Sequence, residues 1–433
     1  MDALTISILS IVLFLLFLTF GMRIGVALII TGFIGMVLLR DVGRAMSMLV
    51  INSWGQVAVF SLAVIPMFLL MGVFATEAGI TKDLFTACYK WFGYFRGGLG
   101  HVTIGTAALV SMFVGSATAT TGTITTICYP EMTKYKYKPL PSAAIIASSS
   151  SYGLLIPPSI GFILYCTAAG TSVGKQFAAG IVPGAICVVL AFVVVAIWAR
   201  RDPEAMPRGE KFPLNEKLAS LKGVIGFAIL VALMLGGIFT GFFSPSEGGA
   251  IGAGGAFVIM ILRRKATIKV VLKCLLDTAR MSGMIFILMV GANYFGVMLA
   301  MTQMPSVLAR TLSGWDSGFA VVLVVIAVYI LLGMVMDTLA LITILTPIFF
   351  PLVIAMGWDS MWFGNIMVMC MLIGLITPPE GIPVYLMAQM TGQPVMKIFI
   401  ACLPFVAMLF VVLGLLIFIE PLSTWLPALM LSA

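Results

Sequence analysis

The sequence predicts an all-α polytopic membrane protein with two inverted repeats, each built from broken helices and a re-entrant hairpin. The first observation is composition: 61% of the 433 residues are hydrophobic and only 9% are charged, whereas soluble domains carry about 25% charged residues. The second is a series of apolar runs, many of which reach the roughly 20 residues that cross a bilayer as a helix. The third is a pair of proline-bent segments, 153–159 and 374–380, each inside such a run.

The apolar runs divide into two comparable groups around a polar segment, 200–222, which we expect to be a solvated cytoplasmic linker. We expect N-terminal scaffold helices in 1–50, a first repeat in 51–199, further scaffold helices in 223–275 and a second repeat in 276–433. The runs lie near 4–21, 24–39, 57–75, 101–128, 142–168, 177–199, 223–243, 248–262, 281–301, 316–354, 362–390 and 397–419.

The two groups share the spacing of their motifs. Pro158 and Pro183 are 25 residues apart, and so are Pro379 and Pro404. The motif that begins at position 115 lies 42 residues before the first Pro-Pro, and its counterpart that begins at 333 lies 45 residues before the second. A three-residue insertion would reconcile the two halves, and internal repeats of this kind are usual in secondary transporters.

Charge in the connectors predicts that the repeats are inverted. The connector after the first motif contains Lys134, Lys136 and Lys138, whereas its counterpart, 355–361, contains no Lys or Arg and has Asp359. Because basic connectors face the cytoplasm, the two equivalent connectors should lie on opposite sides of the membrane. Two runs are open to two interpretations, a re-entrant hairpin or an ordinary span flanked by surface helices: 57–75 and 281–301.

Each Pro-Pro turn must interrupt its helix, because proline lacks a backbone donor and clashes with the preceding turn. In hydrocarbon the freed carbonyl and amide groups are costly unless they line a protein cavity. Matching breaks in two halves are typical of the central binding site of a transporter. We therefore expect the two bent segments to meet and to form the site.

Hydroxyl side chains accompany the first glycine motif. Ser116 and several threonines lie between and beside Gly115 and Gly122. This composition fits close helix packing, and it also fits an unwound helix whose carbonyl and hydroxyl oxygens coordinate a cation such as sodium. The matching Pro-Pro turn favours the second interpretation.

Three polar residues in the second half are further candidates. Asp337 lies deep in an apolar stretch, where a carboxylate costs about 2.5–3.5 kcal/mol, so we expect it to be a cation ligand, a proton carrier or an anchor of a hydrogen-bond network. The alternative is a structural hydrogen bond between helices. Glu380 either marks the mouth of the site or simply lies at a helix N-terminus, where a carboxylate is favoured. Asn293 would lie at a hairpin tip if its run were re-entrant.

Other residue types argue against an enzyme and against nucleic-acid binding. His101 is the single histidine, and no nucleophile is paired with a base in a recognisable motif. The seven cysteines are scattered without a C-x-x-C pair, which predicts neither a disulfide framework nor a zinc site. The net charge of +8 arises in connectors, as expected of cytoplasmic loops near membrane lipid.

Together, several segments resemble the large membrane subunit of the tripartite ATP-independent periplasmic (TRAP) transporters, the DctM family. They are Gly115-Ser116-Ala117 with its threonines, both bent segments and Ala63 to Gly72, and the resemblance covers essentially the whole chain. It implies an elevator-type fold like that of the ion transporter superfamily, in the bacterial inner membrane. It implies import of a small carboxylate, such as a C4-dicarboxylate or a sialic acid, with Na+ as the coupling ion and no organic cofactor. It also implies two partners, a small four-helix membrane subunit and a periplasmic substrate-binding protein.

The resemblance further implies which residues form the site. One sodium site would use Ser116 with backbone around Gly115, Gly153, Ile156 and Pro158. A second would use Gly333 and Thr338 with backbone at Gly374, Thr377 and Pro379, and Asp337 would lie beside it. The candidates for the substrate contact are Thr118, Thr120, Thr121, Asn293, Asp337 and Glu380.

Two alternatives stay open from the sequence. One is a stand-alone sodium/carboxylate symporter of related fold that needs no binding protein, and uptake by this chain alone would favour it. The other is an intramembrane enzyme, which would have no reason to be stabilised by sodium.

Overall fold

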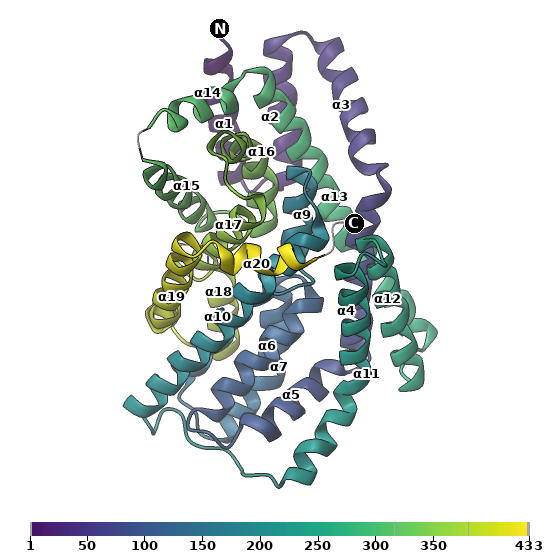
Figure 1. Cartoon of the computed structure of the whole chain (residues 1–433), viewed down its shortest axis with the longest axis vertical. Coiled ribbons are helices and arrows are strands. Elements are labelled where there is room, and N and C mark those ends of the chain that lie inside the picture. Colours follow the sequence, from purple (N-terminus) through teal and green to yellow (C-terminus); the bar gives the residue numbers. More distant parts are fainter. Residues whose placement is uncertain (1, 316, 380, 431–433) are drawn as a thin grey trace.

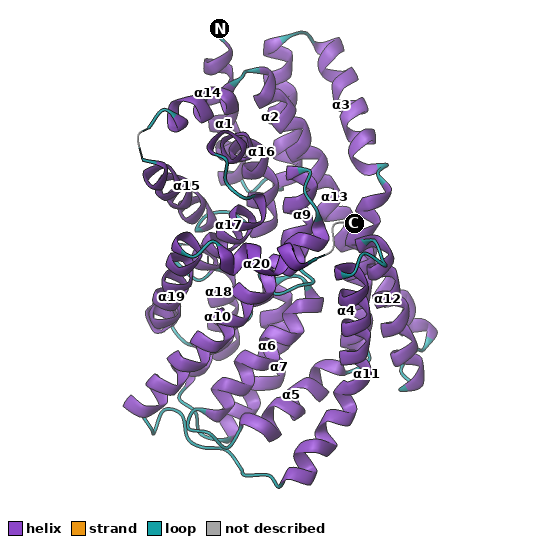
Figure 2. Cartoon of the chain, in the orientation of Figure 1, coloured by secondary structure: helices purple, strands orange, loops and turns teal. Residues whose placement is uncertain are grey.

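The computed structural model describes residues 2–315, 317–379 and 381–430, and Figure 1 shows its course. Every regular element in these ranges is helical (Figure 2). Seven of the described helices are long and apolar enough to cross a membrane, so the predicted all-α membrane fold is confirmed. The elements are α1 (Ala3–Thr19), α2 (Ile24–Leu39), α3 (Val42–Val57), the short 3-10 turn η1 (Phe60–Ala63), α4 (Val64–Glu77), α5 (Ile80–Phe92), α6 (Gly98–Val114), α7 (Ala117–Lys134), α8 (Pro139–Ser149), the turn η2 (Tyr152–Leu154), α9 (Ile160–Ala169), α10 (Val173–Arg201), α11 (Leu214–Phe239), α12 (Pro245–Leu262), α13 (Ile268–Met301), α14 (Met304–Ser313), α15 (Gly318–Gly333), α16 (Thr338–Met356), α17 (Ser360–Leu375), α18 (Ile382–Thr391), α19 (Val395–Phe418) and α20 (Pro421–Leu429).

Two of the apolar runs fold as helical hairpins. The run 101–128 becomes α6 and α7, and Thr103 Oγ1 near the start of α6 lies 3.9 Å from Met132 Sδ near the end of α7. The run 316–354 becomes α15 and α16, and a Cβ on Gly318 at the start of α15 would lie 3.3 Å from the Met356 Cε at the end of α16. Because the beginning of each pair meets its end, both are antiparallel hairpins with a tip between their helices.

The hairpin interpretation of 57–75 and 281–301 is wrong. The first run folds as η1 and α4, and the second is the C-terminal part of α13, a single helix of 34 residues. The first left-handed residues, Gly79 and Gln303, come only where α4 and α13 have ended, so neither run contains a residue that turns the chain back. Each helix instead leads into a short amphipathic helix, α5 or α14, which is the other interpretation left open above.

Both Pro-Pro segments break their helices, as predicted. The first break separates α8 from α9 and includes η2; the second separates α17 from α18. Ser159 begins α9, where its hydroxyl accepts from the Phe162 N–H at 3.4 Å and donates to the Leu154 carbonyl at 2.6 Å. These two hydrogen bonds join the two sides of the first break and satisfy two backbone groups that the missing helical turn leaves free.

From the hairpin tips onward, the two repeats align with one constant separation of 221 positions: 116 to 337, 130 to 351, 157 to 378 and 183 to 404. The expected three-residue insertion is therefore wrong. Gly115 follows the last residue of α6, whereas Gly333 is itself the last residue of α15, so the two glycines are not equivalent. The equivalent pair is Ser116 and Asp337, which are the N-caps of α7 and α16.

The bases of the two hairpins lie at opposite ends of α10. Lys138 Nζ at the base of the first hairpin is 2.8 Å from the Asp202 carboxylate, just beyond the C-terminus of α10. Gln176, in the first turn of α10, donates to the Met361 carbonyl at the base of the second hairpin at 3.3 Å. Residues 176 and 202 are about 39 Å apart at 1.5 Å per helical residue. The hairpins therefore enter from opposite sides, with α6 and α7 low and α15 and α16 high in Figure 1, and the inverted repeats are confirmed.

Each hairpin packs against the broken helix of the other repeat. α7 contacts α18, where the Thr125 hydroxyl donates to Met387 Sδ at 3.0 Å. α16 contacts α9, where a Cβ on Gly161 would lie 3.2 Å from Ile342 Cδ1. The hairpins and broken helices thus interlock as one unit, and this arrangement brings both tips to its interior.

The polar connector 200–222 is partly folded against the first hairpin rather than fully solvated. Ala205 and Met206 are buried, the Lys138 N–H donates to the Ala205 carbonyl at 3.1 Å, and the Tyr137 hydroxyl donates to the Pro207 carbonyl at 3.0 Å. These contacts fasten the connector to the base of α7 and α8. Its placement on the cytoplasmic side stays a prediction.

Candidate ion and substrate site

The tip of the first hairpin is a sharp turn between two helices. α6 ends at Val114, and Gly115 then adopts φ +69°, which a Cβ would disfavour. Ser116 follows as the N-cap of α7, and its hydroxyl oxygen accepts from the Ala119 N–H at 3.4 Å. A Cβ on Gly115 would also overlap the Ile160 side chain of α9. The turn therefore places Ser116 directly beside the first broken helix.

The tip of the second hairpin carries a carboxylate in the position of that serine. Asp337 is half-buried, and one of its oxygens, Oδ2, accepts from the Leu339 N–H at 3.0 Å as the N-cap of α16. Neither carboxylate oxygen has a Lys or Arg partner among the described ion pairs, and Oδ1 has no described donor. The described hydrogen bond of Asp337 thus caps its own helix and is not the bond between helices that was the structural alternative, and the other oxygen is left for a ligand.

Oxygen atoms of the first break are also available. None of the described backbone or side-chain donors outside regular helix bonds reaches the carbonyls of Gly153, Ile156 or Pro158. A Cβ on Gly153 would overlap Ser111 of α6, so the break is pressed against the first hairpin one turn before its tip. The structure therefore brings the first break, at Gly153 and Ile160, against the hairpin that carries Gly115 and Ser116; that the five residues hold one sodium ion stays a prediction.

The second break approaches the second tip in the same way. A Cβ on Gly374 would lie 2.6 Å from the Gly333 carbonyl carbon, and Thr338 is buried at the start of α16. The Thr377 hydroxyl donates to the Ile373 carbonyl at 2.6 Å, and the Pro379 carbonyl already accepts from the Tyr385 hydroxyl at 3.0 Å. Of the predicted second set, Gly333 and Gly374 are thus in contact, and the Pro379 carbonyl is less available than that of its counterpart Pro158.

The predicted substrate residues separate into groups. Thr118 is exposed, whereas Thr120 and Thr121 are buried on α7. The Thr121 hydroxyl donates to the Ala117 carbonyl at 2.8 Å, but Thr120 Oγ1 has no described partner. Asn293 lies inside the continuous helix α13 and not at a hairpin tip, and Glu380 lies outside the described residues.

A cavity of about 190 Å³ lies beside the first tip, between that hairpin and the helices α4 and α13, which pack against each other. The hairpin contributes Val114, Ala119 and Thr123 to its wall. Sequence reasoning did not find the remaining wall, because its residues form no local motif and come together only through packing. They are Leu69, Gly72, Val73, Thr76 and Glu77 of α4 and Asp277 and Met281 of α13.

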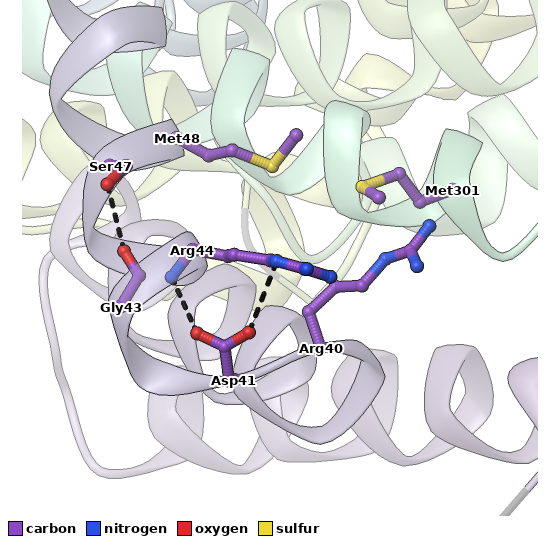
Figure 3. A pocket seen from close by; sticks show the side chains of 7 residues that line it. All are labelled: Arg40, Asp41, Gly43, Arg44, Ser47, Met48 and Met301. Carbon is purple, nitrogen blue, oxygen red and sulfur yellow. Dashed lines mark hydrogen bonds and ion pairs between the residues drawn. The ribbon is translucent and has the colours of Figure 1, made fainter.

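A larger pocket, of about 580 Å³, lies at the junction of α2 and α3 (Figure 3). Arg44 pairs with Asp41 at 3.4 Å there, and Arg40 extends toward Met301. None of its wall residues comes from a hairpin or a broken helix. This pocket is therefore separate from the candidate site.

Side-chain chemistry favours an oxygen-lined site. The described residues contain no group of three or more His, Cys, Asp or Glu side chains that could hold a metal ion. A cation at either tip would be held by carbonyl and hydroxyl oxygens, with the Asp337 carboxylate at the second. Hard monovalent cations take such ligands.

Comparisons with known proteins agree with this architecture. Residues 11–422 match the family described as "Tripartite ATP-independent periplasmic transporter, DctM component". The C4-dicarboxylate TRAP transporter large permease protein of Pseudomonas aeruginosa is 35% identical over 371 residues, covering 85% of this chain and 86% of the relative. The sialic acid TRAP transporter large permease protein of Vibrio cholerae is 29% identical over 420 residues, covering 95% and 96%.

A solved structure shares the fold. The crystal structure of the Alcanivorax borkumensis YdaH transporter, described as having an unusual topology, superposes with a TM-score of 0.61 over 89% of this chain and 90% of that one, at 14% identity. The fold and the family match together define a polytopic membrane transporter with paired inverted hairpins. The chain belongs to the DctM family: it is the large membrane component of a tripartite ATP-independent periplasmic transporter, and it resides in the bacterial inner membrane.

Proposed function

We propose that this subunit imports a small organic acid together with sodium, by an elevator mechanism. It would receive the acid from a periplasmic substrate-binding protein and work beside a small four-helix membrane subunit. The observation that carries the proposal is the pairing of two inverted hairpin tips with two broken helices, the first of which has carbonyl oxygens that no described donor outside regular helix bonds reaches. Such freed oxygens inside a membrane protein are typical of cation and substrate sites in secondary transporters.

The first sodium ion would be held by the Ser116 hydroxyl and the carbonyls of Gly115, Gly153, Ile156 and Pro158. The second would be held around Gly333, Thr338, Gly374, Thr377 and Pro379, with the Asp337 carboxylate nearby. Carbonyl oxygens replace part of the hydration shell of an alkali ion without burying a charge. The free carbonyls of the first break and the free Asp337 oxygen fit this role.

The carboxylate of the substrate would lie between the tips. The N-termini of α7 and α16 begin there, and each helix N-terminus carries about half a positive charge, which attracts an anion. Thr120 adds a buried hydroxyl with unused hydrogen-bonding capacity. The relatives that transport C4-dicarboxylate and sialic acid support an organic acid as the cargo.

The interlocked hairpins and broken helices would move as the elevator, against helices outside that unit such as α4 and α13. Two sodium ions with one monoanion carry one net positive charge inward, which gains about 2.3 kcal/mol per 100 mV of membrane potential. This coupling would drive accumulation of the acid. The proposal thus assigns the energy source to the two ion sites and not to nucleotide hydrolysis.

Uptake into proteoliposomes tests the proposal. The complete membrane complex, with its binding protein outside, should accumulate labelled acid when sodium is outside and potassium inside, and stop when sodium is replaced by choline. Sodium-independent uptake would contradict the coupling. Equal uptake without the binding protein would instead favour the stand-alone symporter.

A further inference from the structure

The helix that opens each repeat carries a Gly-Val pair at the same place. Gly72 and Val73 lie in α4, and Gly296 and Val297 lie in α13. Each glycine precedes by seven positions the left-handed residue that ends its helix, from 72 to Gly79 and from 296 to Gln303. Counted from these helix ends, the two glycines are therefore equivalent positions, 224 apart and not 221, because the second repeat has three residues fewer between this helix end and its hairpin tip.

Gly72 is seated on the tip of the first hairpin. A Cβ at this position would overlap the Phe113 carbonyl oxygen, lie 2.8 Å from the Phe113 carbonyl carbon and lie 3.5 Å from Val114 Cα. The overlapping atoms belong to backbone and not to a side chain that could rotate away. Only glycine therefore allows α4 to approach the last turn of α6 this closely.

Gly296 meets its hairpin far from the tip. A Cβ there would lie 3.5 Å from Pro347 Cβ, which is an ordinary contact. Pro347 is in α16, ten positions beyond the N-cap Asp337. At 1.5 Å per residue, this places the contact about 15 Å down the helix from the tip. The two equivalent helices thus hold their hairpins at different heights.

One cavity indicates the side of the membrane to which the structure is open. The cavity beside the first tip is walled by Thr76 and Glu77 at the end of α4 that continues into α5. Arg263, which follows the last residue of α12, reaches this end of α4: it donates to the Ala78 carbonyl and pairs with Asp83 of α5, and basic connectors face the cytoplasm. The cavity therefore leads from the first tip toward the cytoplasmic side.

We propose that Gly72 and Gly296 are two alternating seats for the hairpin tips, where a seat is the glycine of α4 or α13 against which the backbone of a tip packs. This inference rests on the proposed elevator transport. In the structure, which the charge rule makes inward-facing, Gly72 receives the first tip and Gly296 lies against the middle of α16. In the outward-facing state the arrangement is exchanged: Gly296 receives the second tip near Gly333, and Gly72 lies against α7 about ten residues beyond Ser116.

Alanine substitutions separate the two seats. Gly72→Ala excludes the inward-facing contact and should shift the population toward the outward-facing state. Gly296→Ala is tolerated in the inward-facing state and should exclude the outward-facing one. Gly254→Ala, in α12, is the matched control, because a Cβ there would meet nothing within 4 Å.

Cysteine labelling of the complete transporter in inside-out vesicles reports the state. The reporter is Thr123→Cys in the cavity wall, and a membrane-impermeant maleimide is the probe. The seven native cysteines are buried, which keeps their background low. We expect Gly72→Ala to slow labelling about tenfold or more, Gly296→Ala to maintain or accelerate it, and Gly254→Ala to leave it unchanged. Both seat variants should slow uptake relative to the control.

The inference is overturned if both seat variants match Gly254→Ala, or if both shift labelling in the same direction. Should Gly72→Ala fail to fold, Gly296→Ala decides alone, since its uptake must fall while labelling does not. Failure of the proposed function is a separate result, because it appears as absent sodium-driven uptake in the unsubstituted transporter. The labelling ratios would still report the seats in that case.

Discussion

At the scale of single residues, Ser116 and Asp337 occupy equivalent positions of the two repeats, one at each proposed ion site. Both are N-caps of the second helix of a hairpin, and both use one side-chain oxygen on the helix. A hydroxyl is neutral, whereas a carboxylate adds a negative charge beside the N-terminus of α16. We infer that the two ion sites differ in charge although their backbones are arranged in the same way.

Replacing Asp337 by Asn should abolish sodium-driven uptake and preserve the fold. Asn retains an oxygen that caps a helix as well as Asp does, so only the charge is lost. Asp359→Asn is the matched control, since Asp359 also caps a helix, by accepting from the Met361 and Trp362 N–H groups at 2.8 and 2.9 Å, but lies at the hairpin base. Unchanged uptake in Asp337→Asn, measured at equal expression, would remove Asp337 from the mechanism.

Thr120 should contribute to substrate affinity. Thr120→Val removes a buried hydroxyl that has no partner within the protein, so we expect a higher KM for the acid, by about five- to tenfold, without loss of stability. Thr121→Val is the control, because that hydroxyl is already used by the Ala117 carbonyl. Uptake kinetics that are equal in the two variants would contradict this role.

At the scale of elements, the site depends on how closely each broken helix approaches its hairpin. Gly374 lies against the Gly333 backbone, and Gly153 lies against Ser111. A methyl group at either glycine would force the break away from the tip and separate the oxygens that we assign to one ion. These two glycines thus affect the ion sites by allowing close approach of the backbones, and they supply no side-chain ligand.

Gly374→Ala should therefore weaken sodium activation of uptake. We expect the sodium concentration for half-maximal uptake to rise about tenfold or more, which corresponds to about 1.4 kcal/mol. Gly414→Ala in α19 is the control, because a Cβ there would meet nothing within 4 Å. A sodium dependence shared by Gly374→Ala and the control would show that this approach does not shape the ion site.

Much of this element-level structure could be predicted from the sequence. The Pro-Pro turns predicted the position of both breaks, because proline removes a backbone donor wherever it lies. The contrast between the lysines at 134–138 and Asp359 in the equivalent connector predicted the inversion. The hairpins were harder to place, since an apolar run of one length fits a span or a folded pair. The equivalence of Ser116 and Asp337 was hidden because the tips differ in sequence, so matching glycines gave the wrong register.

At the scale of the whole molecule, the two repeats interlock, and each hairpin packs on the broken helix of the other repeat. α7 packs on α18 and α16 packs on α9, and Gln176 of the first repeat donates to Asn365 Oδ1 of the second at 3.2 Å. Both residues are fully buried. Such cross-repeat contacts could not be predicted from either half, because they depend on packing between segments far apart in the chain.

The central claim is that the tips and breaks form sodium sites, and thermal unfolding of the purified protein tests it most directly. The midpoint is measured in sodium chloride and in choline chloride at equal ionic strength. A ligand that binds only the folded state stabilises it by about 2.7 kcal/mol at 100 times its Kd, so we predict a higher midpoint in sodium and a smaller rise in Asp337→Asn. Identical midpoints in sodium and choline for the unsubstituted protein would contradict the account.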